Sequence, residues 1–191
     1  MIDTGMLNPD SVRPIEVTPR MTLLFNGLAV SAVTLASLLP LAAFAYWLVI
    51  DGDAVREMSG LAEAVHPDID MGQRIAAALV ALVATAPLAW GLVRLKICLN
   101  CFAAGHPFAP RGIAGLRDFA LGSMLSALVQ LISHTVMGLV LTWNAAPGYR
   151  QLTVQINAEL IFLVLFAGII AALAWALEKA AAIADENSQF V

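Results

Sequence analysis

Four long apolar stretches, separated by polar segments, dominate the pattern of this 191-residue chain. None of them contains Lys, Arg, Asp or Glu, and each is near or above the roughly 18–20 residues that cross a bilayer as a helix. They do not alternate as membrane β-strands would, and only helices satisfy backbone hydrogen bonds inside a single span. The pattern predicts an all-α integral membrane protein with one membrane domain over 1–191 and spans at about 23–50, 75–93, 119–143 and 160–177.

Prolines and glycines mark where these helices bend or end. Pro40 lies inside the first stretch, which is longer than a straight span requires, so a tilt or kink is expected there. The second helix is predicted to continue through Cys101 and to end at Gly105. Pro110 suits the first turn of the following helix.

Lysine and arginine set the predicted orientation, because cytoplasmic segments of membrane proteins are enriched in them. Seven of the ten lie in the N-terminal segment, the connection 94–118 and the C-terminal tail, and three lie in the connections 51–74 and 144–159. Both termini and the loop 94–118 are therefore predicted to be cytoplasmic. The other two loops are predicted to be external, in the inner membrane of a bacterium.

Tryptophan placement supports the same four-span arrangement, since indole prefers the membrane–water boundary. Trp47 and Trp143 fall at the predicted outer boundary, and Trp90 and Trp175 at the inner one. In the first outer loop, apolar residues recur at helical spacing between residues 55 and 65, which predicts a short amphipathic helix on the outer surface.

Composition strengthens the membrane assignment and narrows the functions. The chain is 60% hydrophobic and 13% charged, whereas soluble domains have about 45–50% apolar and about 25% charged residues. The net charge of −4 gives no support for direct nucleic-acid binding. No catalytic constellation stands out, so the sequence predicts a non-enzymatic protein without a cofactor.

One short motif has the residue types of a redox or metal site. Cys98 and Cys101 form a Cys-Leu-Asn-Cys sequence, and His106 follows five residues later. A pair spaced in this way can be redox-active or supply half of a metal site. A structural zinc ion needs four ligands, however, and no second pair exists. The alternative is that both cysteines are small residues on a helix at the membrane boundary.

His134 is the ionisable residue inside a predicted span, and Gln130 lies one turn before it. Polar groups in a span often mark functional sites, such as a ligand site or a proton relay. The alternative is a neutral histidine that forms a hydrogen bond to a Ser or Thr of a neighbouring helix.

The fourth stretch carries small residues at every fourth position, beginning with Gly168, Ala172 and Ala176. Such a stripe lets two helix backbones approach closely. It predicts a packing face that contacts another helix of the same chain or a helix of another chain.

Two segments of the predicted inner side resemble a known family. Residues 95–108 and the acidic tail 184–191, together with Arg111 and Arg117, are similar to a bacterial family of four-helix membrane proteins, domain of unknown function 2975. The resemblance implies no catalytic residue. It implies partnership with a small helix-turn-helix regulator, because members are often encoded beside one.

These observations leave three functional hypotheses. The first is a regulatory or interaction protein that contacts a protein partner through Gly105, Phe108, Arg111 and Glu186 on the inner side. The second is an accessory subunit of a larger respiratory or photosynthetic membrane complex. The third is a small transporter or redox protein that uses His134 or the cysteine pair.

Overall fold

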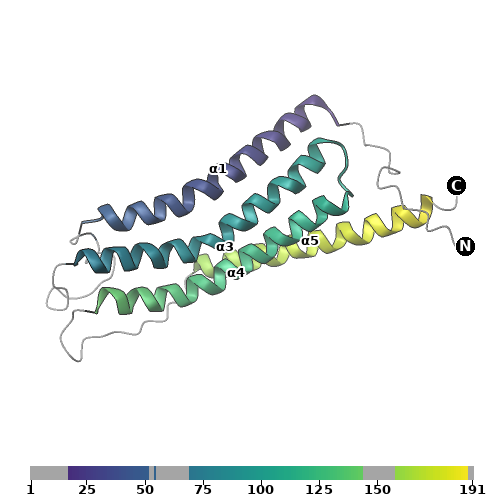
Figure 1. Ribbon diagram of the computed structural model, residues 1–191. Coiled ribbons are helices and arrows are strands. Elements are labelled where there is room, and N and C mark those ends of the chain that lie inside the picture. Colours follow the sequence, from purple (N-terminus) through teal and green to yellow (C-terminus); the bar gives the residue numbers. More distant parts are fainter. Residues whose placement is uncertain (1–16, 52–53, 55–68, 144–157, 189–191) are drawn as a thin grey trace, which may run out of the picture.

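The computed structural model describes residues 17–51, 54, 69–143 and 158–188. Four long helices follow one another along this part of the chain (Figure 1): α1 Pro19–Val49, α3 Met71–Ala103, α4 Pro110–Leu141 and α5 Ala158–Ser188. All four are long and apolar enough to cross a membrane, which confirms the all-α class and indicates a multi-pass membrane protein. The predicted amphipathic helix and most of the loop 144–159 lie outside the described residues.

Local sequence signals explain where the helices begin. The Asp70 carboxylate accepts a hydrogen bond from the Met71 N–H, and the Gln73 side chain accepts one from the Asp70 N–H. This reciprocal capping box satisfies N–H groups that have no partner within the helix. A proline lies in the first turn of both α1 and α4, where its missing N–H costs nothing. The helix α1 continues through Pro40 without interruption.

The helices extend beyond the predicted spans. Most of the connection 94–118 is helical, as predicted for the second helix through Cys101 and for the next helix from Pro110, and only residues 104–109 form a turn. The helix α5 likewise continues through the tail to Ser188. The predicted spans contain only the apolar runs, because hydropathy excludes the polar residues on either side. Those polar residues still form intrahelical hydrogen bonds, so each helix continues beyond its apolar run.

The main helix contacts run in chain order, α1 with α3, α3 with α4 and α4 with α5. Figure 1 shows α1, α3 and α4 side by side in an open row, with α5 crossing α4. The backbones of α3 and α4 are in close contact at Gly91 and Gly122, where a Cβ on Gly122 would lie 2.7 Å from the Pro87 carbonyl oxygen. Small residues therefore hold the centre of the row together.

The row has two distinct ends. At the end with the α3–α4 turn, here called the hairpin end, Phe25 of α1 contacts Phe102 of α3 with ring centroids 5.6 Å apart. At the opposite end, here called the far end, Ile50 and Leu141 form a small buried cluster. Because α5 runs back along α4, Pro19 and Ser188 both lie on the hairpin side of the molecule.

The helix α5 is offset toward the hairpin end. Phe119 of α4 contacts Phe166 of α5 with ring centroids 6.1 Å apart, which fixes the alignment of the two helices. With a rise of about 1.5 Å per residue, α5 starts about 20 Å short of the far end of α4 and extends about 20 Å past Pro110. Figure 1 shows the C-terminal part of α5 projecting in this way.

The offset also affects the relative levels of the two tryptophans that were predicted at the inner boundary. Trp90 precedes Gly91, which lies against Gly122 and Phe119, whereas Trp175 lies nine residues beyond Phe166 toward the hairpin end. At about 1.5 Å per residue the two indoles differ by roughly 15 Å in level. The two indoles therefore lie at different levels along the helices, because α5 is offset from α4, and the assignment of both to one membrane boundary stays a prediction.

Candidate functional site

The turn between α3 and α4 is built from backbone hydrogen bonds. The Gly105 N–H donates to the Phe102 carbonyl at 3.1 Å, and the His106 N–H donates to the Cys101 carbonyl at 2.9 Å. Gly105 adopts a φ of 77°, a left-handed conformation that favours glycine. This pairing is a Schellman motif, so the prediction that Gly105 ends the helix is confirmed.

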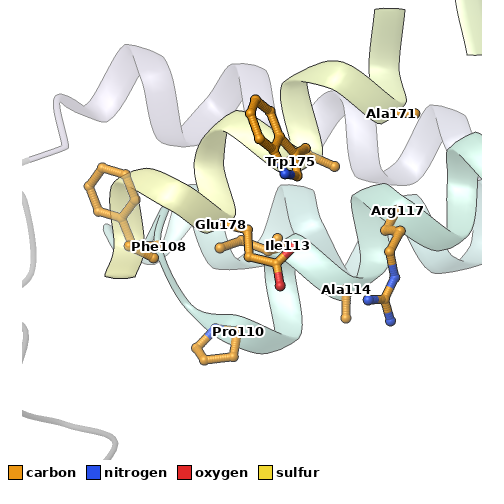
Figure 2. Close-up of a pocket in the computed structure, with 10 residues that line it drawn as sticks. Phe108, Pro110, Ile113, Ala114, Arg117, Ala171, Trp175 and Glu178 are labelled. Atoms are coloured by element: carbon orange, nitrogen blue, oxygen red, sulfur yellow. The ribbon is translucent and has the colours of Figure 1, made fainter. Parts of the chain in front are cut away.

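The turn and the neighbouring helix ends surround a groove of about 380 Å³ at the hairpin end. Phe108 is half-buried and lines this groove, whereas Arg111 and Glu186 are exposed outside it. Figure 2 shows Phe108 and Pro110 near the part of α5 that carries Trp175 and Glu178. The structure thus places Phe108 against α5, and it brings the predicted interaction residues to one end without joining them in a single cluster.

An ion pair joins α3 and α4 just below this end. The Arg94 Nε donates to an Asp118 carboxylate oxygen at 2.7 Å, and an Arg94 terminal nitrogen also contacts that oxygen. A Cβ on Gly115 would lie 2.7 Å from the Arg94 carbonyl oxygen, so the backbones are in close contact at the same level. The pair fixes the two helices of the hairpin beside one another.

The cysteine motif lies in the α3–α4 interface. Cys98 is 1% exposed and packs with Leu116 and Ala174, while half-buried Cys101 faces Gly112. His106 is exposed in the turn. Within the described residues no group of three or more His, Cys, Asp or Glu side chains is arranged to hold a metal ion. The packing of Cys98 agrees with the alternative that the cysteines are small interfacial residues.

His134 lies on the surface of α4 toward the far end, and Gln130 is half-buried. Among the described residues His134 has no hydrogen-bond partner, so the expected bond to a Ser or Thr of a neighbouring helix is wrong there. The offset of α5 explains this exposure. From the Phe119–Phe166 contact, the start of α5 lies about 10 Å short of His134.

The small-residue stripe of α5 does not form a contact within the described part of the chain. Gly168, Ala172 and Ala176 are exposed, and a Cβ on Gly168 would meet nothing within 4 Å. The buried face contains Ala167 and Ala174 instead. A four-residue spacing drifts by about 40° per step, so the stripe winds around the helix, whereas a seven-residue spacing stays on one face. The prediction of packing within the chain is therefore wrong, and packing against another chain stays a prediction.

Two residues that the sequence analysis did not single out join the helices at the far end. The Gln73 amide donates to the Val140 carbonyl at 3.1 Å, and an Arg74 guanidinium nitrogen donates to the Ile50 carbonyl at 2.6 Å. The first turn of α3 therefore supplies donors to the C-terminal ends of both α4 and α1. The Asp-x-x-Gln capping pattern at Asp70 was the available signal, because it places the helix start before Gln73.

Comparison of the chain with protein-family models, with curated proteins and with solved structures gives no match.

Proposed function

We propose that this chain is a non-enzymatic membrane protein of the bacterial inner membrane that contacts a soluble protein partner at its hairpin end. The projecting C-terminal part of α5 is the observation that supports the proposal most. It continues as a helix about 20 Å past Pro110, and its exposed residues include Lys179, Ile183 and Glu186. Ile183 is 60% exposed among charged neighbours, which suits an apolar anchor of a helix-mediated contact.

The hairpin beside it supports a rigid contact surface. The Schellman turn at Gly105 and the ion pair between Arg94 and Asp118 fix both helices of the hairpin. Arg111 is exposed on this end and adds positive charge near the projecting helix. In the orientation predicted from Lys and Arg, the surface faces the cytoplasm, where a small helix-turn-helix regulator of the kind implied by the family resemblance would reach it.

A photocrosslinking residue at position 183 tests this proposal, with position 161 as the matched control. Ile161 and Ile183 are isoleucines of the same helix with equal 60% exposure, but they lie near opposite ends. In cells, we expect one discrete crosslink to a soluble protein from position 183 and none from 161. Replacing Ile183 with Asp should abolish co-purification of that protein. Equal crosslinking from both positions, or no protein crosslink from 183, would contradict the proposal.

The second candidate is an accessory subunit of a larger membrane complex, and the exposed stripe of α5 favours it. Gly168 has open space where a neighbouring backbone would fit, and Ala172 and Ala176 continue the small surface. If the chain is such a subunit, Gly168→Ile should disrupt its contact with the complex, so the detergent-extracted protein should migrate on a native gel as a smaller species. The Tm of the isolated chain should stay unchanged, because the added side chain meets no described atom. Migration of the wild type as a lone 20.2 kDa chain would exclude this candidate.

A further inference from the structure

The groove at the hairpin end has apolar walls and two opposite charges. Its volume of about 380 Å³ lies within the range of ligand pockets, which is roughly 300–1,000 Å³. Ile113, Ala171 and Trp175 belong to the walls, and Arg117 of α4 and Glu178 of α5 are its charged residues. Trp175 is 63% exposed, as expected of an indole at the headgroup layer.

The two charges lie in the same groove without neutralising one another. Neither Arg117 nor Glu178 forms an ion pair with a described residue, whereas the carboxylate next to Arg117, Asp118, is bound by Arg94. Figure 2 shows the carboxylate of Glu178 and the guanidinium of Arg117 pointing to the same side of the groove, with Ala114 between them along α4. A ligand with both a negative and a positive group would therefore meet a partner for each.

The helix offset determines which of the two charged residues of the groove lies deeper in the membrane. Arg117 lies just before the apolar run of α4, and Glu178 follows directly after the apolar run of α5. Because α5 is displaced toward the hairpin end, Arg117 lies deeper and Glu178 lies nearer to water. Side chains on a helix lean toward the N-terminus of that helix. Because α4 and α5 are antiparallel, Arg117 leans toward the hairpin end and Glu178 leans away from it, so the two side chains lean toward one another along the groove.

We propose that this groove binds one phospholipid with a phosphoethanolamine headgroup. The phosphate would accept hydrogen bonds from Arg117, and the ammonium group above it would donate to Glu178. Ala171 and Trp175 would lie beside the headgroup, and the acyl chains would extend deeper than Arg117, past the exposed Leu121 of α4. Arginine suits the phosphate because its planar guanidinium binds two oxygens at once. Phosphatidylglycerol lacks the ammonium group, and a choline headgroup has no N–H to donate to Glu178. The site is therefore selective for a primary amine beside a phosphate.

Native mass spectrometry of the full chain in detergent tests the proposal, using phosphatidylethanolamine, phosphatidylglycerol and phosphatidylcholine with identical acyl chains. Wild type should retain phosphatidylethanolamine about tenfold better than the other two, the difference expected for one charge-assisted hydrogen bond. Glu178→Gln should remove this preference, and Arg117→Gln should reduce retention of all three. Arg111→Gln and Glu186→Gln are the matched controls, since both side chains are exposed outside the groove.

Arg117→Lys keeps the positive charge and should retain most of the binding, which separates loss of the phosphate contact from loss of folding. Circular dichroism of each variant should show unchanged helicity. Equal retention of phosphatidylglycerol and phosphatidylethanolamine by wild type would overturn the proposal. An equal effect of Arg117→Gln and Arg111→Gln, or no retained lipid at all, would overturn it as well.

Discussion

At the scale of single residues, the absence of a side chain allows one of the closest helix contacts among the described residues. Gly122 of α4 lies against Gly91 and the Pro87 carbonyl of α3, and a Cβ there would lie 2.9 Å from the Gly91 Cα. Both neighbours are backbone atoms that cannot move without separating the helices. Gly27 of α1 has nothing within 4 Å of its Cβ position, so it tolerates a side chain.

Gly122→Ala should destabilise the protein by about 1–3 kcal/mol, because the added methyl overpacks a backbone contact. For a chain of this size that corresponds to a fall in Tm of roughly 2–12 °C, measured in detergent by differential scanning fluorimetry. Gly27→Ala is the control and should leave the Tm unchanged or slightly higher, because alanine favours the helix. Equal Tm values for the two variants would contradict the close approach of α3 and α4.

At the scale of elements, the first turn of α3 connects three helices. The Gln73 oxygen caps α3 at Asp70, and its nitrogen donates to carbonyls at the end of α4. Arg74 donates to the Leu48 and Ile50 carbonyls at the end of α1. Carbonyls at helix ends lack intrahelical partners, so these donors replace water at the far end.

Gln73→Met should lower the free energy of unfolding by about 1–3 kcal/mol, because it leaves buried carbonyls of α4 and the Asp70 N–H without their partner. Gln130→Met is the matched control, since Gln130 is half-buried and forms no hydrogen bond with a described residue. Thermal unfolding in detergent measures both variants. If Gln130→Met proves as costly as Gln73→Met, the contacts of Gln73 do not carry the stability assigned to them.

The sequence predicted helices better than it predicted their relative positions. Run length identified all four helices, and Gly105 and Pro110 correctly marked the turn, because those signals are local. The buried face of α5 was predicted wrongly, since alanine and glycine are frequent on every side of that helix. The offset that exposes His134 depends on the contact between Phe119 and Phe166, and no local pattern encodes such a contact.

At the scale of the whole molecule, the even number of spans brings both described ends of the chain to the hairpin side (Figure 1). The bias of Lys and Arg predicts that this side faces the cytoplasm. Cys98 is unsuitable as a reporter of sidedness because it is 1% exposed. His106 in the turn and Asp51 at the far end are both exposed and offer better positions for a reporter.

His106→Cys, in a background with both native cysteines replaced by alanine, should resist a membrane-impermeant maleimide in cells with an intact inner membrane and react after permeabilisation. Asp51→Cys in the same background should react in both cases. The physical reason is that the bilayer separates the two ends of the helices. The reverse labelling pattern would place the hairpin end outside and would remove the cytoplasmic partner from the proposed function.

The ion pair between Arg94 and Asp118 bears on how the chain enters the membrane during biosynthesis. Arg94 directly follows the apolar run of α3 and Asp118 directly precedes that of α4, so the pair lies at the border of both runs. A lone arginine or aspartate costs about 2.5–3.5 kcal/mol at the centre of an inserting helix on translocon-based scales, and less near the helix ends, where this pair lies. Pairing between the two helices reduces that cost only if both are present, so the translocon should release α3 and α4 into lipid together as a helical hairpin.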